Sequence, residues 1–133
     1  MAPRKPQGLT RAEWEIMRIA WRRKSCLARD VYDEARQRHH WAISTVKTLL
    51  RRLVAKGHLK ASKVGNSFVY RPRRPALKSL LAAADHLIET ALSGMTGPLV
   101  MHLVKKSDLS QEDVAQLRRL LDEHQQQTED DKR

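Results

Sequence analysis

The stretch that decides the fold is Ser44-Thr-Val-Lys-Thr-Leu-Leu-Arg-Arg-Leu-Val-Ala-Lys56, followed by Gly57 and by Leu59-Lys-Ala-Ser-Lys-Val-Gly-Asn-Ser-Phe-Val-Tyr-Arg71. Its first part predicts a helix, because apolar side chains recur every three or four residues. We expect Ser44 to cap this helix and Gly57 to end it, since glycine readily adopts the left-handed conformation found after helix ends. In the second part, Leu59, Ala61 and Lys63 alternate with Lys60, Ser62 and Val64. This two-residue period predicts a two-stranded hairpin that turns at Gly65-Asn66.

Two further helices are predicted before this stretch. Thr10-Arg-Ala-Glu13 is a capping box, in which two side chains accept hydrogen bonds from backbone amides, and it opens a helix through about Lys24. A shorter helix is expected from Ala28 to Arg38, after a turn that contains Ser25 or the Cys26-Leu27 pair. The side chains expected to face inward are Trp14, Met17 and Trp21 in the first helix and Val31 and Ala35 in the second. Three helices followed by a basic hairpin form the winged-helix order, a variant of helix-turn-helix.

The third helix has a polar face opposite its apolar one. Its apolar face contains Val46, Leu49, Leu50, Leu53 and Val54. Its polar face contains Thr45, Lys47, Thr48, Arg51, Arg52 and Lys56, which combine hydroxyls with positive charge and include no acid. Solvated helix faces commonly mix both signs of charge, so this face favours contact with a polyanion.

Positive charge is concentrated in the first half of the chain. Residues 1–75 contain 19 Lys and Arg against 5 Asp and Glu, whereas residues 76–133 contain 7 against 10, for a net charge of +11. This asymmetry indicates a nucleic-acid-binding module joined to a module with another role. Aromatic residues make up 5% of the chain, which is few for a protein that stacks single-stranded bases, so duplex DNA is the expected partner. Arg4 and Lys5 are candidate accessory phosphate or minor-groove contacts.

The second half of the chain predicts three helices with apolar faces. A seam of alternating three- and four-residue steps contains Leu77, Leu80, Ala84, Leu87 and Ala91. Pro98 to Lys105 predicts a short apolar helix, and Ser110-Gln-Glu-Asp113 caps a last one. These helices comprise about 55 residues without an aromatic side chain, so a second copy of the chain is expected to cover them. The expected dimerisation residues are Leu77, Leu80, Leu81, Ala84, Leu87, Ile88, Leu99, Leu103, Leu117, Leu120 and Leu121.

These patterns predict a mainly α fold with a small β-hairpin, in which a winged helix-turn-helix domain precedes a helical dimerisation domain. Pro72-Arg-Arg-Pro75 is the natural boundary, because its two prolines oppose continuation of the last strand. The expected ranges are 1–8 for a flexible arm, 9–74 for the DNA-binding domain, 75–124 for the dimerisation domain and 125–133 for a disordered polar tail.

Three segments carry a resemblance to a known family: Leu9-Thr-Arg-Ala-Glu-Trp-Glu-Ile-Met17, Ser44-Thr-Val-Lys-Thr-Leu-Leu-Arg-Arg-Leu53 and Phe68-Val-Tyr70. At these separations the chain resembles the penicillinase-repressor family of BlaI, MecI and CopY. The resemblance continues through Leu99–Val104 and Leu109–Leu117 and so covers almost the whole chain. It implies a bacterial, dimeric winged-helix repressor of a palindromic operator, usually before genes for β-lactam resistance or copper handling.

The resemblance also implies roles for individual residues. The helix Ser44 to Lys56 would be the recognition helix, and Thr45, Lys47 and Thr48 match its base-reading positions. These residue types suit the role, because a threonine methyl can contact a thymine methyl and lysine can donate to guanine acceptors. The expected phosphate contacts are Ser44, Arg51, Arg52, Lys63, Asn66 and Arg71.

Branches of this family differ in how they are induced. The copper-responsive branch resembles a winged helix with a cysteine-rich tail, whereas Cys26 is the only cysteine here. In the β-lactam branch a membrane sensor-protease signals to the repressor, which is cleaved in the short dimerisation helix. The equivalent position here is His102-Leu103, where that branch usually has Asn-Phe. The resemblance thus implies a sensor-protease pathway as a candidate partner, with cleavage near these two residues.

Other classes of protein fit the sequence less well. The six histidines lack metal-ligand spacing, and no nucleophile motif or glycine-rich phosphate loop is present, so no metal, cofactor or enzymatic activity is expected. Trp14, Trp21 and Trp41 could line a small-molecule pocket, but packing is the favoured role for the first two, while Trp41 could face the core or DNA. No apolar run is long enough to span a bilayer, and a cytoplasmic location is expected.

One alternative function remains open. The chain could be a basic protein-interaction module, or a non-specific DNA-binding module of the nucleoid type. Such binding needs positive charge but has little use for hydroxyls at base-reading positions. The surface formed by Thr45, Lys47 and Thr48 therefore distinguishes this alternative from sequence-specific repression.

Overall fold

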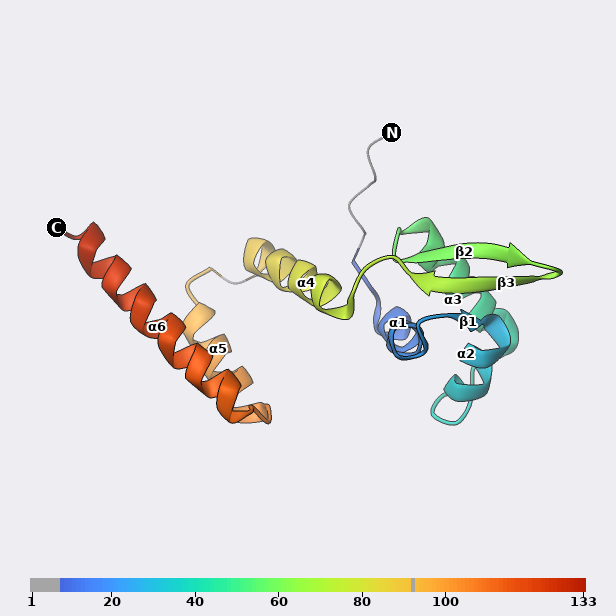
Figure 1. Cartoon of the computed structure of the whole chain (residues 1–133), viewed down its shortest axis with the longest axis horizontal. Coiled ribbons are helices and arrows are strands. Elements are labelled where there is room, and N and C mark those ends of the chain that lie inside the picture. Colours follow the sequence, from blue (N-terminus) through green and yellow to red (C-terminus); the bar gives the residue numbers. More distant parts are fainter. Residues whose placement is uncertain (1–7, 92) are drawn as a thin grey trace, which may run out of the picture. The chain divides into compact units, whose positions relative to one another are not determined.

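The computed structural model describes residues 8–91 and 93–133. Its elements are α1 (Arg11–Arg23), β1 (Cys26–Leu27), α2 (Ala28–Ala35), α3 (Ile43–Ala55), β2 (Leu59–Val64), β3 (Ser67–Pro72), α4 (Ala76–Thr90), α5 (Thr96–Lys106) and α6 (Gln111–Asp131) (Figure 1). The order of α1 to β3 confirms the predicted winged helix-turn-helix within a mainly helical chain. The expected contacts at Arg4 and Lys5 lie outside the described residues.

Contacts divide the chain into two compact units, Met1–His86 and Leu87–Arg133. The division falls within α4, whereas the sequence predicted a boundary after residue 74. The start of α4 belongs to the first unit, where Ser79 is buried. Just before α4, the indole Nε1 of Trp21 donates a hydrogen bond of 2.9 Å to the carbonyl of Arg74.

The core of the first unit is formed by α1, α2, α3 and the base of the sheet. Its fully buried side chains include Ile16, Val31, Val46, Leu50 and Leu59. The predicted inward faces of α2 and α3 are confirmed. The inward stripe predicted for α1 was wrong in part, because the residues it buries are Glu13, Ile16, Met17 and Ala20, while Trp14 and Trp21 are half-buried. Their rings contact each other with centroids 5.8 Å apart, at the edge of the core.

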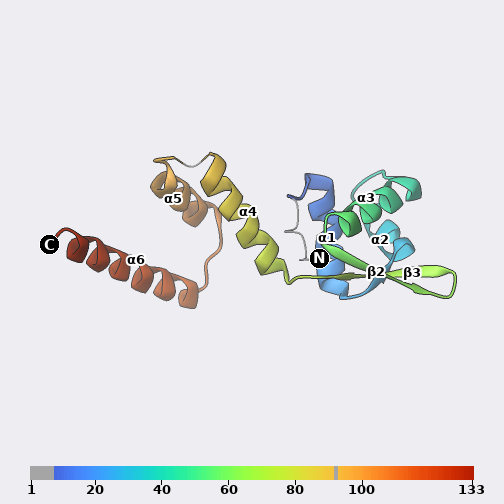
Figure 2. The ribbon, with the colours of Figure 1, turned by 90° about the horizontal axis from the view of Figure 1, so that it is seen from above.

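The sheet has three strands in the order β1-β3-β2, and both pairs are antiparallel. The predicted hairpin is confirmed, with its turn at Gly65, whose φ of +62° lies in the left-handed region. The third strand was missed, because Cys26 and Leu27 were placed in a turn and instead pair with Tyr70 and Val69. Two residues are too few to show the alternation of a strand, so no sequence pattern indicates this pairing. In Figures 1 and 2 the hairpin extends beyond α3.

Two helix boundaries differ from those predicted. Helix α2 ends at Ala35 rather than Arg38, because the amides of Arg38 and His39 both bond to the carbonyl of Ala35 and close a turn. Helix α3 begins at Ile43, so Ser44 lies inside its first turn and is not its cap. Ala42 occupies the N-cap position with an extended backbone and no side-chain hydrogen bond.

The expectation of a disordered tail over residues 125–133 was wrong. Helix α6 continues to Asp131, and its Ser110 hydroxyl and Asp113 carboxylate form the capping box that the sequence predicted. A helix satisfies its own backbone groups without burying apolar surface, and this segment contains no glycine or proline to interrupt it. Within the described ranges, no helix is both long and apolar enough to cross a membrane.

Candidate nucleic-acid interface

Helix α3 presents a polar face on the side opposite the core. Its inward side is fixed by Val46, Leu49, Leu50 and Leu53, each buried. The 3.6-residue period then places the intervening residues outward. The outward residues that are exposed are Ser44, Thr45, Lys47, Arg51 and Arg52, with Thr48 half-buried among them. The structure thus brings together on one face all the predicted base-reading residues and three of the predicted phosphate contacts.

The hydroxyl of Thr48 takes part in the helix itself. Its Oγ1 donates a hydrogen bond of 2.9 Å to the carbonyl of Ser44, one turn earlier. A hydroxyl has one proton and two lone pairs, so this bond uses its only donor. What Thr48 can offer a base in this rotamer is its methyl group and an acceptor. Contact with a thymine methyl or with a base amino group fits that chemistry.

Lys56 does not share this outward role. Its ammonium lies 2.7 Å from the Glu13 carboxylate and 3.3 Å from the carbonyl of Gly8. Burial raises the pKa of Glu13, but hydrogen bonds from Lys56 and Thr10 outweigh it, so the net pKa lies below its ordinary value. The pair joins the start of α1 to the end of α3. Lys56 therefore ties the end of α3 to the start of α1 and is not part of the outward polar face on which the sequence placed it.

Ion pairs also hold α1 against α2, the other helix of the helix-turn-helix. Arg22 and Arg23 both contact the carboxylate of Glu34, the latter at 2.6 Å. Between α2 and α3, the rings of His39 and Trp41 stack with centroids 4.4 Å apart, and Trp41 packs against the core. Of the two roles left open for Trp41, the structure shows the contact with the core. These contacts join α1 to α2 and pack the segment that leads into α3 against the core.

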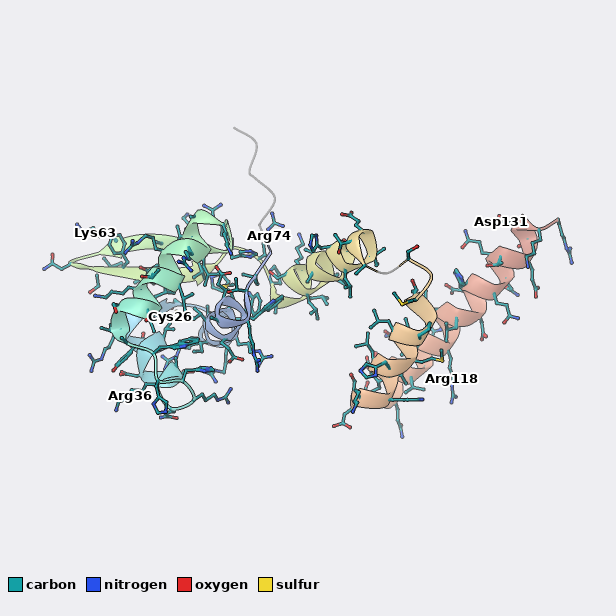
Figure 3. All side chains as sticks on the ribbon, turned by 180° about the vertical axis from the view of Figure 1, so that it is seen from behind. Cys26, Arg36, Lys63, Arg74, Arg118 and Asp131 are labelled. Carbon is teal, nitrogen blue, oxygen red and sulfur yellow. The ribbon has the colours of Figure 1, made fainter. Side chains whose placement is uncertain are left out.

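The hairpin adds a second group of predicted contacts. Lys63 lies near the tip of the hairpin (Figure 3), and Asn66 follows Gly65 in the turn. Directly opposed residues of antiparallel strands share a face, so Lys63 shares one with Phe68, its partner across the ladder. Arg71 is opposed to Lys60, and the two lie three positions along their strands from Phe68 and Lys63; because this offset is odd, they lie on the other face. The structure therefore separates Arg71 from the face shared by Lys63 and Phe68.

A groove of about 730 Å³ lies between α3, the start of α2 and the hairpin, and we call it the wing groove. Its polar lining residues are Arg29, Lys47, Arg51, Asn66 and Ser67, and its apolar and aromatic ones are Leu27, Ala28, Ile43, Val54, Ala61, Phe68 and Tyr70. No acid lines it. Arg29 is partly compensated by Asp33, 3.4 Å away, whereas no ion-pair partner is found for Lys47 or Arg51 among the described residues.

No pattern in the sequence directly predicted this groove. Arg29 lies on α2, outside the predicted recognition helix, and reaches the groove because α2 starts directly after β1 at the edge of the sheet. Arg29 was therefore missed as a groove residue for the same reason that β1 was missed as a strand. Arg29 and Arg36 also flank the ring of Tyr32, at 5.6 and 6.0 Å from its centroid.

Apolar side chains are exposed along α4, α5 and α6. Among the residues predicted for dimerisation, the large ones that are exposed are Leu77, Leu80, Leu81, Leu87, Ile88, Leu103, Leu120 and Leu121. Ala84 is exposed as well, and Leu99 and Leu117 are half-buried. The predicted cleavage position, His102-Leu103, lies in the middle of α5 and both residues are exposed.

Comparison with known proteins gives consistent matches over most of the chain. The model of the family described as "Penicillinase repressor" matches residues 9–123. The methicillin resistance regulatory protein MecI of Mammaliicoccus sciuri is 30% identical over 117 residues, which cover 88% of this chain and 95% of that protein. The penicillinase repressor of Bacillus licheniformis is 28% identical over 113 residues, which cover 85% of this chain and 88% of that protein.

A protein whose role is not described is also similar. The uncharacterized 16.5 kDa protein from the ptsI 3' region of Latilactobacillus sakei is 37% identical over 113 residues, which cover 85% of this chain and 77% of that protein. Among solved structures, the DNA-binding domain of the repressor BlaI matches with a TM-score of 0.51 and 32% identity. That match covers 56% of this chain and 90% of the other.

Proposed function

The chain belongs to the penicillinase repressor family of DNA-binding transcriptional repressors, and we propose that it acts as a homodimer on a palindromic operator. Each recognition helix would enter one major groove, with the two half-sites about one helical turn apart or a multiple of it. Occupation of the operator would block transcription from an overlapping promoter. Genes for antibiotic resistance are one proposed target.

The observation that carries this proposal is the outward face of α3. It combines the hydroxyls of Thr45 and Thr48 with Lys47, Arg51 and Arg52 on one exposed surface. Hydroxyl and lysine side chains can read base edges, while arginines at the margin can hold phosphates. Lys63 and Asn66 extend the positive and polar surface along the hairpin, where a wing would follow the DNA backbone. Arg71, on the other face of the hairpin, would contact phosphate separately from Lys63.

Dimerisation is proposed from the exposed leucine faces of α4 to α6. Apolar surface of this extent is expensive to leave in water, at roughly 25 cal/mol per Å². A second copy offers the same leucine faces, and a two-fold dimer pairs like with like. Two linked DNA-binding domains also bind two half-sites far more tightly than one, because the second contact becomes intramolecular.

Induction is proposed to act by weakening this link. A sensor-protease pathway would cleave α5 near His102-Leu103, both of which are exposed. Proteases bind their substrates in extended form, so cleavage here would first require α5 to unwind locally. After cleavage each half-site would be bound by one domain alone, and repression would be lost.

The decisive experiment is binding of the purified full chain to its own upstream DNA and to scrambled DNA of equal length, followed by footprinting across a salt titration. A protected palindrome with at least a hundredfold preference over scrambled DNA is expected. Equal affinities that fall together as salt rises would instead identify the non-specific basic module, since phosphate contacts alone release counter-ions without reading sequence.

A further inference from the structure

The wing groove contains a feature that phosphate binding does not explain. Lys47 and Arg51 can hold the DNA backbone, but Leu27 and Phe68, which also line the groove, are 37% and 49% exposed. Among the described residues of the winged-helix domain, the other large apolar side chains are buried or half-buried, except Val64 beside the hairpin turn, which is 62% exposed. An exposed aromatic and an exposed leucine beside two uncompensated cations form a surface with both apolar and positive character.

The dimensions of the groove suit a small molecule. Ligand pockets typically measure about 300–1,000 Å³ and combine mostly apolar walls with a few polar groups that fix orientation. Here seven of the twelve lining residues are apolar or aromatic, and the cations lie along the α3 side. Tyr70 adds a hydroxyl: burial raises its pKa and Arg51 partly opposes this, so the phenol stays protonated and can donate.

We propose that the wing groove binds a small amphipathic anion, namely an aromatic carboxylate, and that this ligand and operator DNA exclude each other. The ring would lie against Phe68 and Leu27, and the carboxylate would pair with Arg51 and Lys47. Exclusion follows because Lys47 is a proposed base-reading residue and Arg51 a proposed phosphate contact, so bound ligand occupies groups that DNA needs. This second part depends on the proposed function, whereas ligand binding itself does not.

Direct binding tests the first part with the full chain in the absence of DNA. The probe is 2-naphthoate, and its neutral isostere 2-naphthamide is the chemical control. We expect saturable binding of 2-naphthoate, at least tenfold tighter than that of 2-naphthamide, with amide NMR shifts confined to residues that line the wing groove. Equal binding of both compounds, or shifts centred on the leucine faces of α4 to α6, would overturn the proposal.

Three variants locate the site. Phe68→Ser and Arg51→Gln should each weaken 2-naphthoate at least fivefold, because one removes the apolar contact and the other the ion pair. Lys60→Gln is the matched control, since Lys60 is equally cationic and exposed but lies on the other face of the hairpin. Its binding should equal that of the unchanged chain. Equal losses for Lys60→Gln and Arg51→Gln would show general attraction of an anion to a basic protein and would contradict the site.

Competition tests the second part. At about four times its Kd, 2-naphthoate should reduce the DNA affinity of the unchanged chain about fivefold at constant ionic strength, whereas Phe68→Ser, which binds the ligand at least fivefold more weakly, should show less than a twofold reduction. Ligand bound in the groove with no effect on DNA would overturn the exclusion. If no specific operator exists, the same competition is measured on scrambled DNA, so failure of the proposed function and failure of the ligand site remain distinguishable.

Discussion

The hydroxyl of Thr48 has a role within helix α3 and a proposed role in contact with a base. Because its proton is donated to the Ser44 carbonyl, the methyl group and an oxygen lone pair remain for a base. Replacement of Thr48 with alanine should therefore weaken operator binding by about 1 kcal/mol, roughly fivefold, and leave non-specific binding nearly unchanged. Arg51→Ala should weaken binding to both DNAs, since a phosphate contact is indifferent to sequence. Fluorescence anisotropy on both DNAs checks this, and equal losses for Thr48→Ala would contradict base reading.

Glu13 is a buried carboxylate whose charge state affects stability. Its net pKa is lower in the fold than its ordinary value of 4.5, so the unfolded chain binds the proton more readily. The stabilisation by ionised Glu13 is thus present above pH 4.5 and is lost as the pH falls through the folded value. We expect Glu13→Gln to lower the free energy of unfolding by about 1–3 kcal/mol at neutral pH.

Glu13→Gln also tests the direction in which this contribution to stability changes with pH. The difference in unfolding free energy between Glu13→Gln and the unchanged chain should shrink as the pH is lowered through the acidic range, because both side chains are then neutral. Chemical denaturation at a series of pH values measures it. A difference that stays constant with pH would show that the ionisation of Glu13 does not contribute to stability.

At the scale of elements, the prediction from sequence was most accurate in two cases. One is a helix whose apolar pattern repeats over several turns, and the other is a helix cap or turn marked by a characteristic residue. The buried face of α3 repeats over thirteen residues, and Thr10, Ser110 and Gly65 each mark a boundary through a local hydrogen bond or backbone conformation. β1 was missed because two residues carry no periodicity and pair with a segment 44 positions later. The wing groove was missed for the same reason, since it exists only where α2, α3 and the hairpin meet.

Two predictions were wrong, one drawn from composition and the other from helical spacing. The polar residues 125–133 were expected to be disordered, yet helix α6 needs only its own backbone hydrogen bonds there. Lys56 was counted with the DNA-facing cations because its spacing on α3 allowed it, but the buried Glu13 carboxylate, on another helix, attracts it inward. Thr45, Lys47 and Thr48, by contrast, lie on the outward side of α3 as predicted, because the buried leucines determine which side of the helix faces outward.

The hairpin turn is an element whose geometry depends on one residue. Gly65 has a φ of +62°, which glycine and asparagine adopt more readily than other residues. Gly65→Ala should therefore lower the free energy of unfolding by about 1 kcal/mol, whereas Gly65→Asn should recover most of it. Nothing lies within 4 Å of an added Cβ, so the cost would come from the backbone and not from a clash. Denaturation curves of both variants decide this, and equal stability of all three chains would refute it.

At the scale of the whole molecule, repression would depend on a link between two DNA-binding domains. The seam of α4 is exposed, with Leu80 at 58%, while Ser79 on another side of the helix is buried. Leu80→Asp places a charge in this seam and should convert the dimer to a monomer, because a charge in an apolar interface is costly unless paired. Operator affinity should then fall by about 100-fold or more as the tethering of two half-sites is lost.

Ala82→Asp is the matched control, because Ala82 is exposed on the same helix but lies away from the seam. It adds the same charge and the same helix penalty, so any general effect on α4 appears in both variants. Light scattering should give the mass of one chain for Leu80→Asp and of two for Ala82→Asp. A dimer mass for both would exclude the α4 seam as the link, and the leucine faces of α5 and α6 would then have to supply it. A monomer that still protected the whole palindrome would contradict the tethering argument itself, because repression would not need two joined domains.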